Sequence, residues 1–416
     1  MKILWLSNNP CYAIKKLSPD TQSGGWLKAL NYHLVEKDDV ELSVCFYWPV
    51  PLDSFEFRKT TYYPVTKAKP ENLLQKIISR VSGYKDDDLN IKKIKDIVDK
   101  VNPDLIHVHG TELNLGLIQY ETSIPVVISI QGILSPYYEK YFSGIPEKYL
   151  KRIKKRNFIS FFNELNSSFR INAKRERNIL KVSNYIMGRT AWDKRVTRLL
   201  APESSYFVAN EILREHFYSD KLKWKKTSFD KPLKLITTTG DVAYKGFELI
   251  VKTAKILHEY GIEIEWYVVG LNESNVVPKA VKTWLEYNVE DIGIKLLGVM
   301  NEKELIRILL VSDVYCQVSH IENSPNSLCE AMILGMPLIA TNVGGTSSMV
   351  KNNLEGILVQ EGEPYEYAGA IIELLNDFKK AKKYGENGRK RAMERHRPSK
   401  VVDEILKTYN TIIQKR

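Results

Sequence analysis

Short apolar runs rich in β-branched residues alternate along this chain with longer segments in which apolar residues recur every three or four positions. In the first half, residues 2–6 and 126–130 predict strands, and residues 26–34 and 91–101 predict helices. Two further strands are expected at residues 40–47 and 105–108. Strands that alternate with helices in this way are typical of sheets covered by helices. We therefore expect an α/β fold.

The alternation resumes at residues 233–240, whose sequence predicts a strand that ends in a loop. Residues 314–318 and 337–341 are two more short apolar runs, and the segment between them predicts one loop followed by one helix. This order of strand, loop, helix and strand predicts a βαβ unit. Because ligands of such units bind beyond the carboxyl ends of the strands, we expect a ligand site in that loop.

Two carboxylates, Glu322 and Glu330, bracket this loop and the start of the helix. Ser324 followed by Pro325 predicts a helix N-cap and a first helical residue, and Gly335 predicts the end of the helix. The free N–H groups and the positive end of the helix dipole would then face an anion, for which a diphosphate is well suited. The pattern predicts a sugar-nucleotide site, although two solvated surface glutamates would give the same spacing.

From Glu322 to Gly345 the sequence resembles the fourth family of glycosyltransferases, which are retaining enzymes with the GT-B fold. The family pattern is a glutamate, seven residues, a second glutamate, Ala-Met, Gly-x-Pro and Gly-Gly, and every element is present here. The resemblance implies two Rossmann-like domains that face each other across a cleft. It also implies that Glu330 bonds the donor ribose hydroxyls, and that Glu322 holds hydroxyls of the transferred sugar.

A chain of 416 residues normally folds as two or more domains. We expect an acceptor-side Rossmann-like domain at residues 1–205, a linker at 206–232 and a nucleotide-sugar-binding Rossmann-like domain at 233–395. The resemblance further implies that a helix within residues 396–416 crosses back to the first domain.

Several residues of the first half match positions that the family uses. Gly24 and Gly25 follow the first strand, where a family Gly-Gly faces the donor diphosphate, although a glycine pair is more often simply a turn. His109 ends a predicted strand, where the family has a histidine that contacts the transferred sugar. We expect His107 to point to the opposite face of that strand and to have a structural role. Gln131 stands where many relatives have a second histidine, and an amide cannot carry a proton.

Lys245 matches a family lysine that neutralises the donor diphosphate, and the N–H groups of Asn326 and Ser327 are expected to contact the same group. Asp241, however, stands where relatives commonly have an arginine. A carboxylate cannot stabilise a departing phosphate, so another cation must replace it. Arg189, between a predicted strand and a helix, is the candidate, and an ion pair with Asp193 at helical spacing is its structural alternative.

The formal net charge is +11, and residues 148–181 hold eleven Lys or Arg among interleaved apolar residues. This pattern predicts a helical region on an anionic membrane surface, with a helix packed on its own domain as the alternative. Nucleic acid is not expected, because no nucleic-acid-binding signature accompanies the charge. No apolar run is long enough for a membrane span and the first residues do not resemble a signal peptide, so we expect a cytoplasmic protein peripheral to the inner face of the membrane.

Metal and disulfide chemistry is not indicated. Cys11, Cys45, Cys316 and Cys329 lack metal-ligand spacing and are interpreted as buried or free thiols. The acidic run at residues 86–88 is interpreted as a solvated loop. We expect neither a metal nor a cofactor beyond the nucleoside-diphosphate sugar that serves as the donor substrate.

The sequence thus predicts a metal-independent retaining hexosyltransferase that moves a sugar from a nucleotide-sugar to a saccharide acceptor, lipid-linked and used for surface polysaccharide. A sugar-nucleotide epimerase would share the fold and the donor site but would need no acceptor. A non-catalytic basic membrane-binding protein is a third possibility, and it would lack nucleotide affinity. A dinucleotide-dependent oxidoreductase is disfavoured, because Asn8-Asn9-Pro10 does not supply the glycine-rich fingerprint.

Overall fold

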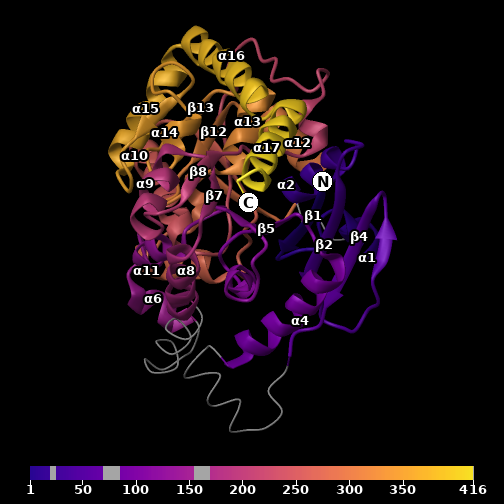
Figure 1. Cartoon of the computed structure of the whole chain (residues 1–416). Coiled ribbons are helices and arrows are strands. Elements are labelled where there is room, and N and C mark those ends of the chain that lie inside the picture. Colours follow the sequence, from indigo (N-terminus) through magenta and orange to yellow (C-terminus); the bar gives the residue numbers. More distant parts are fainter. Residues whose placement is uncertain (19–24, 69–84, 154–168, 416) are drawn as a thin grey trace. The chain divides into compact units, whose positions relative to one another are not determined.

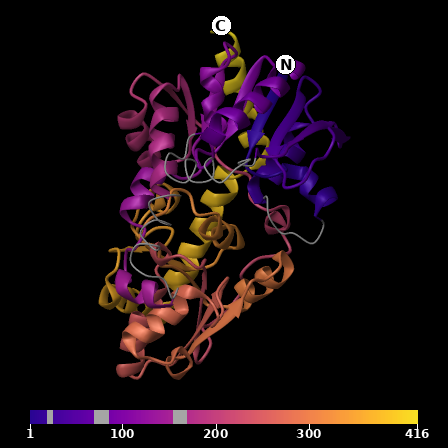
Figure 2. The ribbon, with the colours of Figure 1, turned by 90° about the horizontal axis from the view of Figure 1, so that it is seen from below.

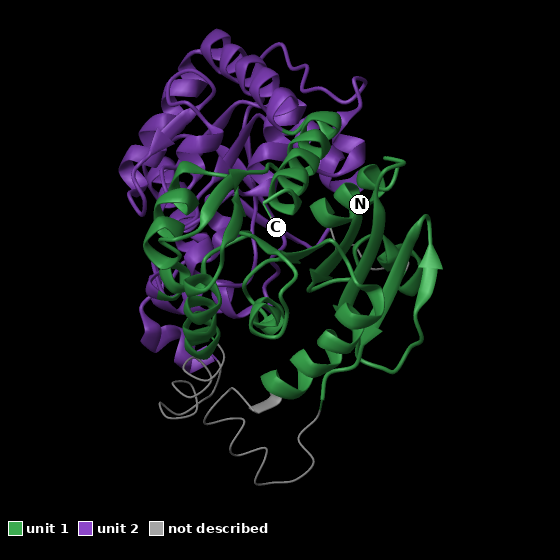
Figure 3. Ribbon diagram, in the orientation of Figure 1, with its two compact units in different colours: residues 1–138, 162–212, 396–416 green, residues 139–161, 213–395 purple. Residues whose placement is uncertain are grey.

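The computed structural model describes residues 1–18, 25–68, 85–153 and 169–415 (Figure 1). The chain forms two compact units, coloured green and purple in Figure 3. Unit 1 comprises Met1–Tyr138, Phe162–Ile212 and His396–Arg416, and unit 2 comprises Glu139–Phe161 and Leu213–Arg395. Each unit is built around its own sheet, as the alternation of strands and helices predicted.

Unit 1 contains an eight-stranded sheet in the order β3-β4-β2-β1-β5-β6-β7-β8. Its strands are β1 Lys2–Ser7, β2 Glu41–Tyr47, β3 Phe55–Phe57, β4 Thr60–Val65, β5 Leu105–His109, β6 Val126–Ser129, β7 Tyr185–Gly188 and β8 Ser205–Val208. All neighbours pair in parallel except β3 and β4, which are antiparallel. The strand order reverses between β1 and β5. The connections after these two strands therefore lead in opposite directions, and open α/β sheets bind their ligands at such a reversal.

The helices of unit 1 occupy the connections between these strands, except for α17, which is the last element of the chain. They are α1 Ile14–Leu17, α2 Gly25–Leu34, α4 Lys85–Val101, α5 Leu134–Glu139, α8 Ile171–Lys181, α9 Ala191–Leu200 and α17 Pro398–Ile413, with 3-10 turns η1 Cys11–Ala13 and η2 Asn114–Tyr120. Helix α4 places Ile91, Ile94 and Val98 on one buried stripe against the strands, at the spacing that an amphipathic helix requires.

Unit 2 contains a six-stranded, all-parallel sheet in the order β11-β10-β9-β12-β13-β14. The strands are β9 Leu233–Thr238, β10 Ile264–Val269, β11 Ile294–Gly298, β12 Val314–Gln317, β13 Leu338–Thr341 and β14 Ile357–Val359. In chain order this is third, second, first, fourth, fifth and sixth, the order of dinucleotide-binding sheets. The order reverses between β9 and β12, so a ligand is expected at the loops after these two strands.

Helices α10 and α11 connect the strands on one side of this reversal, α12 crosses from β11 to β12, and helices α13 to α15 follow on the other side. The helices of unit 2 are α6 Glu147–Ile153, α10 Phe247–Glu259, α11 Val276–Leu285, α12 Glu302–Val311, α13 Asn326–Leu334, α14 Thr346–Met349, α15 Pro364–Asn376 and α16 Phe378–Arg395, with 3-10 turns η4 Glu215–Tyr218, η5 Ala243–Lys245 and η6 Val289–Ile292. Helix α13 is buried around most of its circumference, and it therefore lies in the core of the unit.

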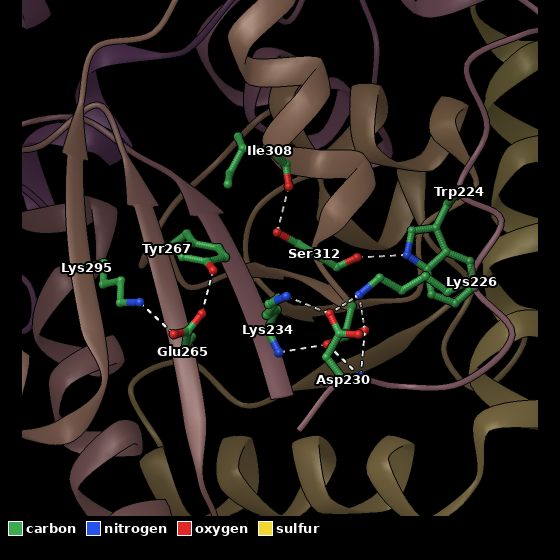
Figure 4. A network of polar contacts seen from close by, with 10 residues as sticks. Trp224, Lys226, Asp230, Lys234, Glu265, Tyr267, Lys295, Ile308 and Ser312 are labelled. Atoms are coloured by element: carbon green, nitrogen blue, oxygen red, sulfur yellow. Dashed lines mark hydrogen bonds and ion pairs between the residues drawn. The ribbon is translucent and has the colours of Figure 1, made fainter. Parts of the chain in front are cut away.

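The predicted linker at residues 206–232 is divided between the two units. Its first residues complete β8, whereas residues 213–232 pack on unit 2. The Trp224 indole N–H donates to the carbonyl of Ser312 at 2.9 Å, and Lys226 Nζ lies 2.6 Å from Asp313 Oδ1. The other Asp313 oxygen accepts from the backbone N–H of Lys234 at 2.7 Å. This network (Figure 4) attaches residues 213–232 to the sheet. Asp313 is fully buried, so its carboxylate needs these hydrogen-bond partners.

Helix α17, the last element of the chain, belongs to unit 1 together with the N-terminal strand (Figure 2). It contacts α2 and β5. Tyr409 is fully buried, and its hydroxyl accepts from the Trp5 indole N–H at 3.0 Å. The two ends of the sequence therefore share one core.

The basic region at residues 148–181 does not form a single element in the part of the chain that the structure describes. Residues 154–168 lie outside the described residues. Before them, α6 belongs to unit 2, where it packs on α11 and buries Leu150. After them, α8 belongs to unit 1. The described parts of the region are thus helical, and for α6 the structure agrees with the alternative of a helix packed on its own domain.

The acidic run at residues 86–88 lies in the first turn of α4, so the prediction of a solvated loop is wrong. Asp87 is buried, and Arg175 Nη1 approaches its Oδ2 at 3.2 Å. The partner is distant in sequence, which is why spacing alone did not reveal it.

The prediction for the cysteines is confirmed, since all four are buried and none forms a disulfide. None of the described helices is long and apolar enough to cross a membrane.

Candidate functional site

The two loops at the reversal point of unit 2 carry two of the predicted site residues. Residues 239–246 follow β9 and hold Lys245, and residues 318–325 follow β12 and hold Glu322. The two loops are tied by a hydrogen bond from the backbone N–H of His320 to the carbonyl of Tyr244 at 2.7 Å. Gly246 has φ +77°, and a Cβ there would lie 2.0 Å from the carbonyl oxygen of Val318. Glycine is therefore required for this close approach.

Lys245 and Glu322 form an ion pair between these loops. Lys245 Nζ lies 2.5 Å from Glu322 Oε1, and the Ser319 hydroxyl donates to the same oxygen at 2.8 Å. Burial lowers the pKa of Lys245, but the charge of Glu322 and its hydrogen bond raise it by more, so the net shift is upward. The lysine is therefore a fixed cation. The structure thus brings together two of the three residues, Glu322, Lys245 and His109, to which the sequence assigned catalytic roles.

The Gly344-Gly345 pair holds the backbone of Glu322 in place. The Gly345 N–H donates to the carbonyl of Glu322 at 2.9 Å. Gly344 has φ +49°, and a Cβ at this position would lie 1.9 Å from the same carbonyl oxygen. The first glycine of the Gly-Gly element is thus explained by packing, because a Cβ at Gly344 does not fit against the loop that carries Glu322.

Helix α13 begins one residue later than the sequence predicted. Pro325 is the N-cap, with extended ψ of 107°, and Asn326 is the first helical residue, so the assignment of Ser324 as N-cap is wrong. The Pro325 carbonyl accepts from the N–H groups of Leu328 and Cys329 at 3.1 and 3.2 Å. The end at Gly335 is confirmed, with φ +81°. Asn326 and Ser327 therefore occupy the first turn, whose N–H groups have no acceptor within a helix.

Glu330 lies on α13, and its carboxylate is paired with Arg214, a residue that sequence reasoning missed. Arg214 Nε donates to Oε1 at 2.6 Å and Nη2 donates to Oε2 at 2.5 Å. Burial raises the pKa of Glu330, and Arg214 opposes that rise. No local pattern could have indicated this pair, because its members are 116 positions apart.

Asp241 has a defined structural role at the position where an arginine was expected. Its Oδ1 accepts from the backbone N–H of Val277 at 2.7 Å, and its Oδ2 accepts from that of Val276 at 3.0 Å. The carboxylate thus satisfies the first turn of α11, where a negative charge is also favoured by the helix dipole.

His320 lies two residues before Glu322 and is buried. The sequence assigned it no role. Its Nε2 lies 2.6 Å from Glu248 Oε1 and its Nδ1 lies 2.9 Å from Glu361 Oε1. Lys140 Nζ pairs with the other Glu361 oxygen at 2.9 Å. Burial lowers the pKa of His320, but the two carboxylates raise it by more, so the net shift is upward and favours the protonated imidazole. No sequence pattern indicated these two ion pairs, because both carboxylates are distant from His320 in sequence.

The remaining predicted residues belong to unit 1. His109 ends β5 and is buried between the rings of Trp5 and Trp26, with centroid distances of 4.5 and 5.7 Å. Within the described residues, neither of its ring nitrogens has a hydrogen-bond partner. Burial, together with His107 and Arg189, lowers the pKa of His109 well below its usual range, so the ring is neutral. A buried, neutral imidazole without partners can still bind a hydroxyl.

The prediction that His107 faces away from His109 is wrong. Their ring centroids lie 3.9 Å apart, because positions two apart on a strand project from the same face. His107 instead contacts the hydroxyls of Tyr409 and Ser129, each at 2.5 Å. Its role within the described residues is therefore to join α17 and β6 to β5.

Arg189 is buried in unit 1 and pairs with a residue other than the one expected. Its Nε lies 3.5 Å from Glu211 Oε2, and its guanidinium stacks 4.2 Å from the Trp26 ring. Asp193 accepts from the Arg189 backbone N–H at 2.9 Å and forms a capping box with Thr190 at the start of α9. The Asp193 carboxylate thus caps α9, and the Arg189 side chain pairs with Glu211.

The glycine pair is only partly described. Gly24 lies outside the described residues. Gly25 is the first residue of α2, and a Cβ built there would meet nothing within 4 Å. Space within unit 1 therefore does not require glycine at position 25.

Residues 219–391 match the family model described as glycosyl transferases group 1. This match lies within unit 2 and contains both loops of the reversal point. Among curated proteins, the capsular polysaccharide biosynthesis glycosyltransferase CapM of Staphylococcus aureus is 27% identical over 234 residues, which cover 53% of this chain and 59% of CapM. The uncharacterized glycosyltransferase MJ1069 of Methanocaldococcus jannaschii is 25% identical over 248 residues, which cover 53% of this chain and 62% of that protein. The matches span less than two thirds of these relatives.

Among solved structures, sucrose-phosphate synthase from Thermosynechococcus elongatus superposes with a TM-score of 0.74 and 15% identity over the whole length of both chains. TarM superposes with a TM-score of 0.67 at 12% identity and covers 98% of each chain. At these identities the likeness concerns the fold. The prediction of two Rossmann-like domains of the GT-B type is thereby confirmed.

Proposed function

We propose that this chain is a retaining, metal-independent glycosyltransferase that moves a hexosyl group from a nucleoside-diphosphate donor to a hydroxyl of a saccharide acceptor. The observation that carries the proposal is the Lys245–Glu322 pair at the reversal point of a dinucleotide-type sheet, next to the start of α13. The group 1 family match over residues 219–391 supports it. A cation, a carboxylate and a helix N-terminus at one point are what a diphosphate-linked sugar requires.

In this proposal each residue of unit 2 contacts a different part of the donor. The N–H groups of Asn326 and Ser327 and the ammonium group of Lys245 bind the diphosphate, and Glu330 accepts from the ribose hydroxyls. Glu322 accepts from hydroxyls of the transferred sugar. Lys245 is already held by Glu322, so the donor enters a site whose charges are fixed beforehand.

The reaction breaks the bond between the anomeric carbon and the leaving diphosphate oxygen, and it forms a bond from that carbon to the acceptor oxygen. The acceptor proton passes to the departing diphosphate, so no protein nucleophile is needed. Lys245 and the start of α13 stabilise the charge that develops on the leaving group. No resident cofactor is assigned, and the nucleotide-sugar is a substrate.

From unit 1, the proposal includes His109 as a contact of the transferred sugar and Arg189, Gly24 and Gly25 as donor-binding residues. His109 supports this assignment by its two ring nitrogens, which have no partner among the described residues. The assignment of Arg189 has weaker support, because its charge is already compensated by Glu211. Replacement of His109 by Phe tests the assignment, since it retains the ring packing and removes both nitrogens, and transfer should fall about tenfold or more.

The acceptor is proposed to be a lipid-linked saccharide of a surface polysaccharide. A relative named for transfer of galactose to a diphosphoundecaprenol-linked sugar in Escherichia coli is 29% identical over 132 residues, 28% of this chain. CapM is named for capsular polysaccharide. A transfer assay with diphosphoundecaprenol-linked and water-soluble sugars would separate the two acceptor classes, and use of the soluble sugars alone would contradict the lipid linkage.

An anionic membrane surface is the proposed partner, with the protein at the cytoplasmic face. Helix α9 of unit 1 exposes Lys194, Arg195 and Arg198 on one face and buries Asp193 and Thr197 on the other. Leu199, beside these cations, is 79% exposed. Cations next to an exposed leucine suit lipid headgroups and the acyl boundary below them.

A thermal-shift screen with UDP, GDP, ADP and their common sugars tests the donor site. A nucleotide at a hundredfold excess over its dissociation constant should stabilise the protein by about 2.7 kcal/mol. Glu330→Ala should remove that shift, whereas Glu386→Ala on the exposed surface of α16 should not. Glu322→Ala should abolish transfer and largely preserve nucleotide binding.

The outcomes separate the competing functions. Release of a free epimer without an acceptor would indicate an epimerase, and the absence of a shift with any nucleotide would favour a binding protein. Wild-type turnover of the Glu322→Ala variant would contradict the proposed catalytic site.

A further inference from the structure

The carboxylate of Glu330 is held in a fixed orientation by a residue outside the family motif. Arg214 bonds both of its oxygens, at 2.6 and 2.5 Å, in the two-pronged geometry that arginine makes with carboxylates. Arg214 lies just before η4, and its guanidinium also contacts the buried Phe217 ring at 4.9 Å. The arginine is therefore itself fixed by packing.

Arg214 also offsets the cost of burying Glu330. The Glu330 side chain is only 5% exposed, whereas that of Arg214 is 26% exposed. A carboxylate at such a depth becomes protonated unless a cation compensates it, and a protonated carboxyl is a weaker acceptor. The two bonds to Arg214 use about two of the four lone-pair positions of the carboxylate, which leaves the others for a ligand.

We propose that Arg214 is a positioning residue for the nucleotide donor, which orients the Glu330 carboxylate so that its remaining lone pairs accept from the ribose hydroxyls. This inference rests on the proposed function. It assigns a role to a residue of the chain segment before η4, which lies outside the family match at residues 219–391. Recognition of the ribose is then a property of the pair rather than of Glu330 alone.

A purely structural role for Arg214 would be to tie its segment to α13. The same segment is tied to α12 by His216, whose Nδ1 lies 3.0 Å from Glu302 Oε1. His216 does not belong to the pair, so His216→Gln is a matched control for loosening of the segment. If Arg214 had only a structural role, its replacement would lower the affinity for all nucleotides by the same factor. If it positions Glu330, its replacement would lower the affinity only for ligands that carry the ribose hydroxyls.

Calorimetric dissociation constants for UDP, GDP and ADP and for their 2′-deoxy counterparts test the inference. For the base that binds, the wild type should prefer the ribonucleotide by about tenfold or more. Arg214→Gln and Glu330→Gln should each reduce this preference to about one, and the double variant should reduce it no further, as expected for coupled residues. Arg214→Lys should retain part of it, because the charge remains while the two-pronged geometry is lost. His216→Gln should leave it unchanged.

The pH dependence gives a second readout that a structural tie would not change. The charged and titratable groups next to Glu330 are Arg214, Glu302 on α12 and Tyr315 on β12. Without Arg214, burial and the charge of Glu302 act on Glu330 unopposed, and its pKa rises further. The ribose preference of Arg214→Lys should therefore persist to lower pH than any residual preference of Arg214→Gln.

The results distinguish failure of this inference from failure of the proposed function. Wild-type protein that binds none of the three nucleotides would refute the donor site itself. A wild-type ribose preference that Glu330→Gln loses but Arg214→Gln retains would overturn the role of Arg214 alone. Loss of affinity for the ribo and deoxy forms by the same factor in Arg214→Gln would also overturn it.

Discussion

At the scale of single residues, the candidate site depends on charges that are paired before any ligand arrives. Lys245 is paired with Glu322, and Arg214 with Glu330. Such pairs contribute little to stability when burial costs are counted, but removing one partner leaves the other charge buried and is costly. The pairs are therefore better explained by the orientation of the carboxylates than by the stability of the fold.

The backbone behind Glu322 gives a first prediction. In Gly344→Ala the new Cβ would collide with the Glu322 carbonyl oxygen, so the loop must move and Glu322 with it. We expect sugar transfer to fall at least tenfold, and stability to fall by about 1–3 kcal/mol in denaturant titration. Gly261→Ala is the control, because Gly261 has a comparable φ of +73° but nothing within 4 Å of a Cβ. Equal effects of the two variants would show that backbone strain alone matters.

His320 predicts how the stability of the second unit depends on pH. Its pKa is raised in the folded protein, where it faces Glu248 on α10 and Glu361 after β14, with Lys140 bonded to Glu361. Its contribution is complete below the unfolded pKa of about 6.5 and is lost as pH rises through the folded pKa. Unfolding free energy should thus decrease on the alkaline side, by about 1.4 kcal/mol for each unit by which the folded pKa exceeds the unfolded one.

Denaturant titrations between pH 6 and pH 9 would measure this dependence. His320→Gln should be less stable throughout, because the buried carboxylate of Glu248 loses its cationic partner, and its stability should change less with pH. His258→Gln, at an exposed position on α10, should follow the wild type. Parallel curves for the wild type and His320→Gln would contradict a histidine whose pKa is raised on folding.

At the scale of elements, the sequence predicted local structure well and distant contacts poorly. Strands and helices are set by the spacing of neighbouring residues, and β1, β2, β5 and β6 start and end within one residue of the predicted limits. The start of α13 was misplaced by one residue, because Pro325 is compatible with both the N-cap and the first helical position. The pairs Arg214–Glu330 and Asp87–Arg175 join positions 116 and 88 apart, and no single-sequence pattern encodes them.

The segment at residues 139–153 shows a similar limit. It follows α5 in sequence, yet it belongs to unit 2, where Lys140 pairs with Glu361 and Tyr149 lies 6.2 Å from the Trp284 ring on α11. Gly144, with φ +84°, approaches Glu248 and His320 so closely that a Cβ would lie 2.0 Å from the first and 2.4 Å from the second. The glycine permits the segment to lie over the buried histidine.

Gly144→Ala should therefore detach this segment from its site, because the clash involves buried, hydrogen-bonded side chains that cannot easily move. We expect faster proteolysis within residues 139–153 and a change in Trp284 fluorescence, while the rest of unit 2 stays folded. Gly261→Ala again serves as the control for strain from a positive φ. An unchanged cleavage rate in Gly144→Ala would show that the segment can shift without leaving.

At the scale of the whole molecule, the charge of +11 is large enough to influence binding partners, but its total does not say where a partner binds. The cations of α9 lie together on one exposed face, beside Leu199. Helix α16 of unit 2 carries a comparable number of exposed cations, including Lys379, Lys382 and Lys383. The two helices therefore allow local charge to be separated from net charge.

Replacing Lys194, Arg195 and Arg198 by Ser removes three charges from α9, and replacing Lys379, Lys382 and Lys383 by Ser removes three from α16. Both variants fall from +11 to +8, since 11 minus 3 is 8. Each basic residue at an anionic surface contributes about 1 kcal/mol, so the α9 variant should lose about a hundredfold in affinity for phosphatidylglycerol vesicles in a sedimentation assay. The α16 variant should lose far less, and added salt should weaken binding of the wild type. Equal losses would mean that net charge rather than α9 drives attraction, and the absence of vesicle binding by the wild type would refute the membrane partner.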